Sequence, residues 1–181
     1  MGKITLYFGC MFSGKTSILI RECRKCMAIG KKVLCINYAQ DNRYSDEEYI
    51  MSHNLDKVDC IKVNTLSDVS DETILNHDYI MVDEGQFFTD LKTYVLKWCE
   101  QFKKNIIVIG LDGDYKRQQF GQIIDLIPYA DDIHKLKAFC KICNDETEAL
   151  FTHRLSKEDE QVIIGNSNYI PLCRQHYLEN N

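Results

Sequence analysis

Residues 9–16 have the residue types and spacing of a phosphate-binding loop. Their sequence, Gly-Cys-Met-Phe-Ser-Gly-Lys-Thr, matches the pattern G-x-x-x-x-G-K-[ST] at every fixed position. In such a loop, glycines let backbone N–H groups surround phosphate oxygens, Lys15 reaches the β and γ phosphates, and the Thr16 hydroxyl can bind Mg²⁺. We therefore predict that a nucleotide is bound by Gly9, Cys10, Met11, Phe12, Ser13, Gly14, Lys15 and Thr16.

A pair of acidic residues follows a short apolar run later in the chain. Residues 79–82 read as a buried parallel strand, and Asp83 and Glu84 come directly after it. Beside a phosphate-binding loop, this is the form of a Walker B site, in which Asp83 holds Mg²⁺ and Glu84 faces the group that attacks the γ-phosphate. We expect the strand tip to lie next to the loop across the sheet. The alternative is an ordinary acidic turn, which would leave the loop without its usual carboxylate partner.

Four candidate metal ligands lie near the carboxyl end of the chain. Cys140 and Cys143 form a C-x-x-C pair, and Cys173 and His176 form a C-x-x-H pair, with residues 144–172 between them. Three thiolates and one imidazole make a closed tetrahedral zinc site with no open position for a reactive water, so we interpret the metal as structural. Two unrelated buried pairs are the alternative, but the paired spacing is more specific than either half.

Apolar runs alternate with helical patterns around these motifs. Strands are predicted at 3–8, 33–36, 60–63, 79–82 and 105–111, and helices from 16 to the stop at Gly30 and at 66–75 and 91–102. Residues 38–55 are predicted to form a long surface loop. Residues 149–152 and 161–164 resemble the arms of a hairpin, followed by a turn at 165–168. We predict an α/β fold with a P-loop (RecA-like) parallel sheet and flanking helices over residues 1–138, and a zinc-ribbon minidomain over residues 139–181.

Length and composition limit the classes of protein. A chain of 181 residues suffices for one α/β core with a small appendage. The net charge of −5 argues against broad binding to nucleic acid, although a small polyanion in one pocket is compatible with it. Nine cysteines without a signal-peptide pattern favour a reducing compartment and a cytoplasmic location. No apolar run is long enough to cross a membrane.

The first predicted helix carries two further patterns. Its basic residues and those just past its end are spaced as a solvated face: Arg21, Arg24, Lys25, Lys31 and Lys32. Cys23 and Cys26 spell C-x-x-C, but no second pair lies nearby. We therefore predict that these two thiols take part in helix packing and hold no metal.

Taken together, the motifs closely resemble those of the type II, cytosolic-type thymidine kinases almost from end to end. Beyond the phosphate-binding loop and the zinc knuckles, the similarity covers Asp83-Glu84-Gly85-Gln86-Phe87-Phe88, Leu111-Asp112-Gly113, Phe120-Gly121 and the second loop Tyr38-Ala39-Gln40-Asp41-Asn42-Arg43-Tyr44. The resemblance implies that Glu84 is the general base for the 5′-hydroxyl of thymidine, while Lys15, Mg²⁺ and Arg43 or Arg117 neutralise charge on the phosphates of ATP. It also assigns Asp41, Arg43, Asp83 and Gln86 to the nucleotide site.

The resemblance implies how thymine is held. In this family the backbone of a lasso loop on the zinc minidomain holds the base, and the loop corresponds here to residues 162–169. The implied substrate residues are Met11, Phe87, Leu111, Tyr115, Val162, Ile163, Ile164, Gly165 and Tyr169. This chain departs from the family pattern at four places. Cys10 replaces the usual proline, Tyr115 a common phenylalanine, and Ile164-Gly165 a common Gly-Gly, which would narrow the lasso. His176 replaces a fourth cysteine, which changes little because imidazole is an ordinary zinc ligand.

Other classes of protein share some of these motifs. A P-loop ATPase with a zinc ribbon acting on nucleic acid or a protein partner would also use the acidic pair, but the chain is acidic and has no evident second module. A catalytically dead nucleotide sensor would lack a placed base, and no Asn-Lys-x-Asp sequence of a regulatory GTPase occurs. For the kinase, the resemblance implies action on thymidine and deoxyuridine, inhibition by thymidine triphosphate and a homotetramer. The acidic composition and the lack of a long apolar run predict neither nucleic-acid nor membrane partners.

Overall fold

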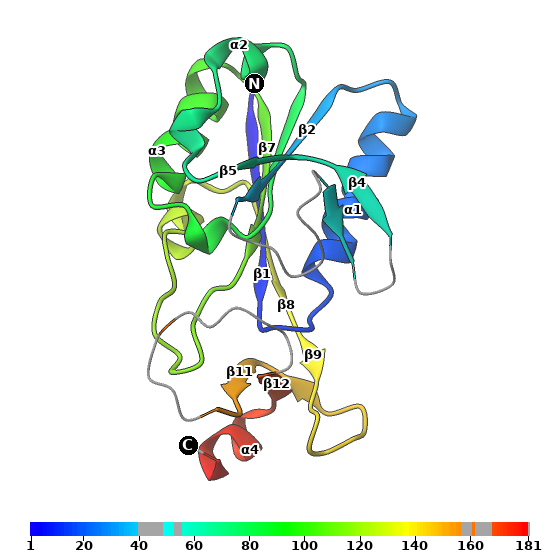
Figure 1. The fold of residues 1–181 in the computed structure, drawn as a ribbon, viewed down its shortest axis with the longest axis vertical. Coiled ribbons are helices and arrows are strands. Elements are labelled where there is room, and N and C mark those ends of the chain that lie inside the picture. The colour runs from blue at the N-terminus through cyan, green and yellow to red at the C-terminus, as the bar shows by residue number, and fades with distance from the viewer. Residues whose placement is uncertain (40–48, 53–55, 157–160, 162–167, 181) are drawn as a thin grey trace.

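A six-stranded sheet forms the centre of the computed structural model, which describes residues 1–39, 49–52, 56–156, 161 and 168–180. The strand order is β5-β2-β6-β7-β1-β8, and every pair of neighbours is parallel (Figure 1). The strands are β1 (Lys3–Gly9), β2 (Val33–Tyr38), β5 (Ile61–Val63), β6 (Tyr79–Val82), β7 (Asn105–Gly110) and β8 (Asp132–Leu136). The predicted α/β class with a parallel sheet is confirmed.

The strand register brings three strand ends to one edge of the sheet. Phe8 of β1 lies beside Gly110 of β7, and Val82 of β6 lies beside Val108. Because parallel strands all point the same way, the residues that follow β6, β7 and β1 meet at the carboxyl edge, where α/β proteins bind their ligands.

Helices cover both faces of the sheet (Figure 1). On one face, α1 (Lys15–Ala28) and the antiparallel pair β3 (Tyr49–Met51) and β4 (Lys57–Asp59) bury Leu19, Cys23 and Ile50 against Cys35 and Met81. On the other face, Leu91, Val95 and Trp98 pack against Ile80 and Val108. The elements of that layer are η1 (Leu66–Asp68), α2 (Asp71–Leu75), η2 (Gly85–Phe87), α3 (Leu91–Leu96), η3 (Lys97–Gln101) and η4 (Ile124–Tyr129).

The C-terminal part of the chain forms two small antiparallel pairs and a short helix beyond the carboxyl edge of the main sheet (Figure 1). Its elements are β9 (Ala138–Phe139), β10 (Glu148–Ala149), β11 (Phe151–Arg154), β12 (Tyr169–Leu172) and α4 (Arg174–Glu179). They bury a small cluster of Cys140, Ala149, Leu172, Cys173 and Tyr177. So small a core needs a further source of stability, such as a metal or the contacts with the main sheet.

Two predicted segments differ from the structure on the N-terminal side. The predicted loop at 38–55 contains the strand β3, because Ile50 is buried against α1 and β3 pairs with β4. The predicted single helix at 66–75 is two short helices, because the Ser70 hydroxyl accepts a hydrogen bond from the Thr73 backbone and so begins a new helix.

Three further segments also differ. Residues 91–102 are helical as predicted, but they end in a π turn over η3, which lets Trp98 and its neighbour Cys99 both face the core. The described partner of β11 is β12, whereas the sequence had suggested 161–164, of which 162–164 lie outside the described residues. The strand β8 was not predicted, because its edge position leaves most of its residues exposed and removes the apolar run.

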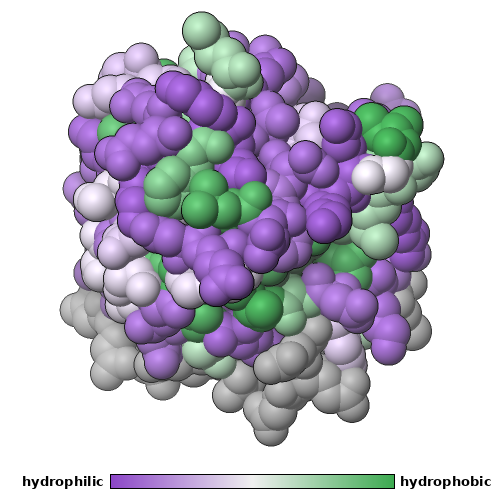
Figure 2. All heavy atoms as spheres, turned by 90° about the horizontal axis from the view of Figure 1, so that it is seen from above, coloured by the Kyte–Doolittle hydropathy of each residue, from purple (hydrophilic) through white to green (hydrophobic). Residues whose placement is uncertain are grey.

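The surface at the amino end of the strands is mostly hydrophilic, with small separate hydrophobic patches (Figure 2). Large apolar side chains that are exposed in the molecule include Met1, Met27, Ile29 and Leu75. Isolated apolar side chains of this kind are normal on protein surfaces. Within the described part of the chain, no helix has both the length and the apolar character needed to cross a bilayer.

Candidate active site

The phosphate-binding loop connects β1 to α1 in the predicted position. Gly9 permits a close approach to β8, because a side-chain carbon there would lie 2.3 Å from the Leu136 carbonyl oxygen. Lys15 Nζ donates a hydrogen bond of 2.7 Å to the Cys10 carbonyl, which places its ammonium group over the loop. Ser13 Oγ is buried and has no hydrogen-bond partner among the described residues. A buried hydroxyl of this kind inside a loop rich in backbone N–H groups fits a bound phosphate.

The same loop is attached to the C-terminal part of the chain. The Met11 backbone N–H donates to Thr152 Oγ1 at 3.0 Å, and Cys10 Sγ donates to the Ala149 carbonyl at 3.5 Å. Burial raises the pKa of the Cys10 thiol, so this side chain remains a hydrogen-bond donor at neutral pH. Cys10, which stands where the resembling family has proline, therefore adds a contact that proline could not make.

Asp83 and Glu84 follow β6 and are both buried, with exposures of 3% and 6%. The Asp83 carboxylate accepts a hydrogen bond of 3.0 Å from the Glu84 backbone N–H. Glu84 has a left-handed backbone conformation with φ 51°, which is costly for a residue other than glycine and is concentrated at functional sites. The two carboxylates thus occupy one strand tip in a strained turn.

The acidic pair is not adjacent to the phosphate-binding strand, which corrects the sequence-based expectation. The strand β7 lies between β6 and β1 in the sheet. This separation is decided by long-range strand pairing, which a local motif does not encode. The acidic pair and the loop therefore lie at the same edge of the sheet, on either side of the end of β7, which Leu111 follows.

The Gln86 side chain connects Glu84 to the end of β7. Gln86 Nε2 donates to Glu84 Oε2 at 2.5 Å, and Gln86 Oε1 accepts from the Leu111 backbone N–H at 3.0 Å. The side chain is 3% exposed. Gly110 leaves room for it, because a side-chain carbon at that position would lie 2.2 Å from Gln86 Oε1. Gln86, which the family resemblance assigns to nucleotide binding, therefore also orients the Glu84 carboxylate.

Three of the predicted substrate residues, Met11, Phe87 and Leu111, make contacts near the carboxyl edge of the sheet. Phe87 stacks on Tyr38 with ring centroids 5.1 Å apart and meets Phe120 edge-on at 5.4 Å. Leu111 is fixed through its backbone by Gln86, and Met11 through its backbone by Thr152. Six of the predicted nucleotide and substrate residues lie outside the described residues: Asp41, Arg43, Val162, Ile163, Ile164 and Gly165.

Tyr115 and Tyr169 meet at Arg154, a residue that no motif of the sequence singles out. The guanidinium carbon of Arg154 lies 3.7 Å from the Tyr115 ring centroid, and its Nη2 atom donates to the Tyr169 hydroxyl at 2.7 Å. The Tyr115 carbonyl also accepts a hydrogen bond of 2.5 Å from the Tyr177 hydroxyl. Thr152 and Arg154 both lie on β11 and are buried. A threonine and an arginine at alternate positions of a short strand were the available signal for such contacts.

Cys140, Cys143, Cys173 and His176 come together as predicted, and their ligand atoms all lie within 4.8 Å of one another. The three sulfur atoms lie 3.3 to 3.5 Å from His176 Nδ1, and the Cys143 and Cys173 sulfurs are 3.9 Å apart. Tetrahedral zinc with Zn–S bonds of about 2.3 Å requires sulfur atoms about 3.8 Å apart, so the group fits zinc.

The electrostatics of two of these cysteines also suit a cation. Burial alone would raise the pKa of Cys140, but backbone hydrogen bonds from Cys143, Cys173 and Ile142 outweigh burial and lower this pKa to about 6. Thiolate is the form that binds zinc. For Cys143, burial and the adjacent Cys140 raise the pKa to about 11. A bound cation would attract the thiolate form of Cys143 and so oppose this rise.

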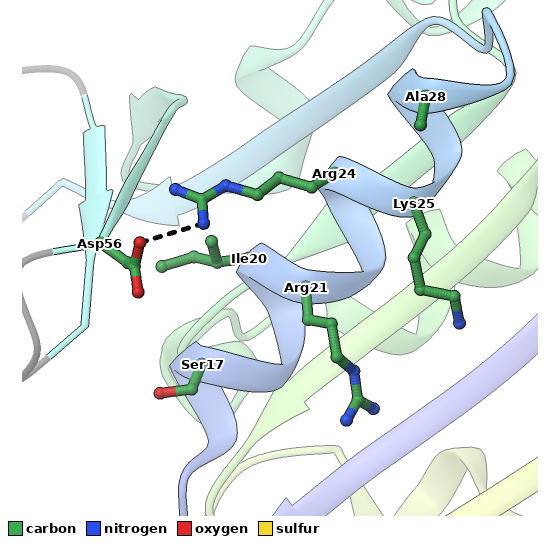
Figure 3. A pocket seen from close by; sticks show the side chains of 7 residues that line it. All are labelled: Ser17, Ile20, Arg21, Arg24, Lys25, Ala28 and Asp56. Carbon is green, nitrogen blue, oxygen red and sulfur yellow. Dashed lines mark hydrogen bonds and ion pairs between the residues drawn. The ribbon is translucent and has the colours of Figure 1, made fainter.

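A hollow of about 400 Å³ lies along the exposed side of α1 (Figure 3). It is lined by Ser17, Ile20, Arg21, Arg24, Lys25, Ala28 and Asp56. Arg24 pairs with Asp56 at 3.0 Å, and Arg21 and Lys25 both pair with Glu22. The basic side chains of α1 are exposed and satisfied by neighbouring carboxylates, so the predicted solvated face is confirmed. The predicted helix packing of Cys23 is also confirmed, since its sulfur lies in the core 3.8 Å from Cys35 Sγ.

A phosphate-binding loop, a strand-tip carboxylate pair and a Cys₃His group beside the same sheet edge define an α/β P-loop protein of the phosphoryl-transfer type. The sequence model of the thymidine kinase family matches residues 2–177. A thymidine kinase of Oryza sativa subsp. japonica is 39% identical over 98% of this chain and 67% of its own length. The cytosolic thymidine kinase of Cricetulus griseus is 37% identical over 98% of this chain and 74% of its own. The thymidine kinase of Vaccinia virus (strain Western Reserve) is 37% identical over 98% of both chains. The chain belongs to the thymidine kinase family.

Proposed function

We propose that this protein transfers the γ-phosphate of ATP to the 5′-hydroxyl of thymidine, giving thymidine monophosphate and ADP. Family membership supports the reaction, and deoxyuridine is the expected second substrate. The observation that carries the proposal is the buried Glu84 carboxylate, held by Gln86 at the sheet edge that also bears the phosphate-binding loop. The reaction class of an ATPase with a zinc ribbon is disfavoured by a family match that extends across both parts of the chain.

The residues divide the chemical work as follows. Glu84 takes the proton of the 5′-hydroxyl as that oxygen bonds to the γ-phosphorus, and the bond from the γ-phosphorus to the bridging oxygen of ADP breaks. Lys15 and the backbone of residues 9–16 bind the phosphates and stabilise their developing charge. Thr16 and Asp83 would hold Mg²⁺, which neutralises charge on the phosphate oxygens when bound. Arg43 or Arg117 adds positive charge.

The thymine side of the site is proposed from the same family. Met11, Phe87, Leu111 and Tyr115 form its walls, and Tyr169 and the backbone of residues 162–165 read the base. Asp41 and Arg43 contact the nucleotide. Cys140, Cys143, Cys173 and His176 hold a structural zinc that stabilises the minidomain of residues 139–181 against the nucleotide-binding domain of residues 1–138. A cytoplasmic homotetramer inhibited by thymidine triphosphate completes the proposal.

The test is a nucleoside panel with ATP and Mg²⁺, in which thymidine and deoxyuridine should be phosphorylated in preference to purine nucleosides. In the Glu84→Gln variant the amide oxygen can still accept from Gln86, so the geometry is kept while the basicity is lost. We expect binding of both substrates to persist while kcat falls by about 10² or more. The control is Glu100→Gln, which changes an exposed carboxylate on η3. Near-normal turnover by Glu84→Gln would remove Glu84 from the role of base.

A further inference from the structure

Arg154 is a buried cation at the end of β11. It is 5% exposed, and it lies opposite Tyr169 in the register of β11 with β12. Burying a guanidinium group is costly unless its N–H groups and charge are compensated. The contacts that compensate it are therefore structurally important, and all that are described here involve residues around the proposed thymine site.

Two of these contacts involve aromatic side chains that are assigned to the thymine-binding site. The guanidinium carbon lies 3.7 Å from the Tyr115 ring centroid and 5.2 Å from that of Tyr169. At 3.7 Å the guanidinium is in van der Waals contact with one face of the Tyr115 ring, so a planar base can stack only on the other face. The hydrogen bond to the Tyr169 hydroxyl fixes the second ring at the same time.

A third contact closes a ring of interactions between the two parts of the chain. Arg154 Nη2 donates to the Gln161 carbonyl at 3.0 Å, and Gln161 Nε2 donates to Asp114 Oδ2 at 2.9 Å. Asp114 precedes Tyr115 in sequence, and its Oδ1 atom accepts from the backbone of Lys116 and Gln118. The segment after β7 is thus tied to β11 directly by the Tyr115 ring and, through Gln161, by the Asp114 carboxylate.

We propose that Arg154 is a positioning residue for thymine recognition, which sets the orientation of Tyr115 and Tyr169 and thereby the affinity for the nucleoside. This inference rests on the proposed function of the site. Arg154 has no assigned contact with the substrate, yet through the two tyrosines it governs the thymidine KM. Lysine would not replace it, because an ammonium group lacks the planar fork that stacks on one ring while bonding to a second.

The test compares Arg154→Met and Arg154→Lys in the full-length protein. We expect Arg154→Met to raise the thymidine KM by about tenfold or more, as the loss of a desolvated cation–aromatic contact predicts. The KM for ATP should stay within about twofold, because the phosphate-binding loop makes none of the contacts described for Arg154. The thymidine KM of Arg154→Lys should be closer to that of Arg154→Met than to that of the wild type.

The matched control is Arg174→Met, which removes an exposed arginine that lies 4.9 Å from the Phe151 ring on the same part of the chain. It should leave both KM values unchanged. Zinc content and the melting temperature are measured for each variant. An unchanged thymidine KM in Arg154→Met would overturn the proposal. So would a joint loss of ATP affinity, kcat and zinc, because that result indicates a structural role alone.

A double-mutant cycle keeps the test decisive if Arg154→Met does not fold. Tyr115→Leu removes the stacked ring, and Arg154→Lys should then add less than about a twofold change in thymidine KM. Independent, multiplicative effects would refute the coupling. A wild-type protein that fails to phosphorylate thymidine would defeat the proposed function itself, whereas an active wild type with uncoupled variants defeats the inference about Arg154 alone.

Discussion

The contact between Gln86 and Glu84 allows the role of Glu84 as a base to be tested without replacing it. In Gln86→Glu, the donor that lies 2.5 Å from the Glu84 carboxylate becomes a second carboxylate of nearly the same shape. The oxygen that accepts from the Leu111 N–H is retained. The substitution therefore changes the charge next to the proposed base while keeping the fold of the strand tip.

The size of the effect follows from the separation of the two charges. When oxygens of two carboxylates are in contact, the centres of their charges lie about 4 Å apart. Like unit charges at about that separation, with an effective dielectric constant of about 20, repel by about 4 kcal/mol, which corresponds to about three pKa units. Relaxation of the new side chain will absorb part of this energy, so we expect the pair to retain one proton up to a pH higher by about one to three units. A base works only when deprotonated, so the acid limb of the rate must move to higher pH.

The assay is kcat and kcat/KM for thymidine as a function of pH, measured through ADP release. The control is Gln122→Glu, because the Gln122 side chain also bonds at both ends, accepting from the Lys92 N–H and donating to the Thr89 carbonyl, away from the carboxylate pair. Its acid limb should match that of the wild type. If Gln86→Glu is folded and active with an unshifted acid limb, then either the contact with Gln86 or the assignment of Glu84 as the base is wrong.

Two further predictions concern stability. Removing zinc with a chelator, or substituting Cys140→Ser, should raise the thymidine KM and unfold residues 139–180 at a lower temperature than the sheet, because structural zinc contributes about 10–16 kcal/mol of binding energy to folding. The control is Cys26→Ser, which lies outside the cluster. An unchanged KM and an unchanged melting curve would contradict the role of the metal. The backbone N–H of Lys32 lowers the pKa of Asp78, so this carboxylate stabilises the fold above about pH 4 and loses that effect as the pH falls. Asp78→Asn should accordingly lower the melting temperature at pH 7, and by progressively less as the pH falls below about 4. A loss that stays equal as the pH falls would exclude the charge as the cause.

Several features of the site could be predicted because they are encoded locally. A phosphate-binding loop holds its ligand mainly through its own backbone, so glycine, lysine and threonine at set spacings in residues 9–16 predict such a loop. In the pairs Cys140–Cys143 and Cys173–His176 only two residues separate the two ligands, and this spacing predicts a shared metal. The central strands are apolar on both faces and therefore appear as continuous apolar runs.

Other features depend on contacts between distant segments. The position of β7 between β6 and β1, and the pairing of β11 with β12, are choices among strand partners whose individual sequences fit more than one neighbour. The edge strand β8 shows no apolar run or alternation in its sequence, because its three central residues are exposed. The contacts of Gln86 with Glu84 and of Arg154 with Tyr115 join residues whose roles are invisible until the chain is folded.

The sequence by itself determined the class of chemistry, since phosphate binding, carboxylate placement at a strand tip and metal ligation each require particular residue types at short spacings. The tertiary structure alone decided which neighbours orient those groups. The physical reason is that a buried carboxylate or guanidinium must be satisfied by whatever polar groups the fold brings within about 3 Å. Those partners are selected by packing and strand order over the whole chain.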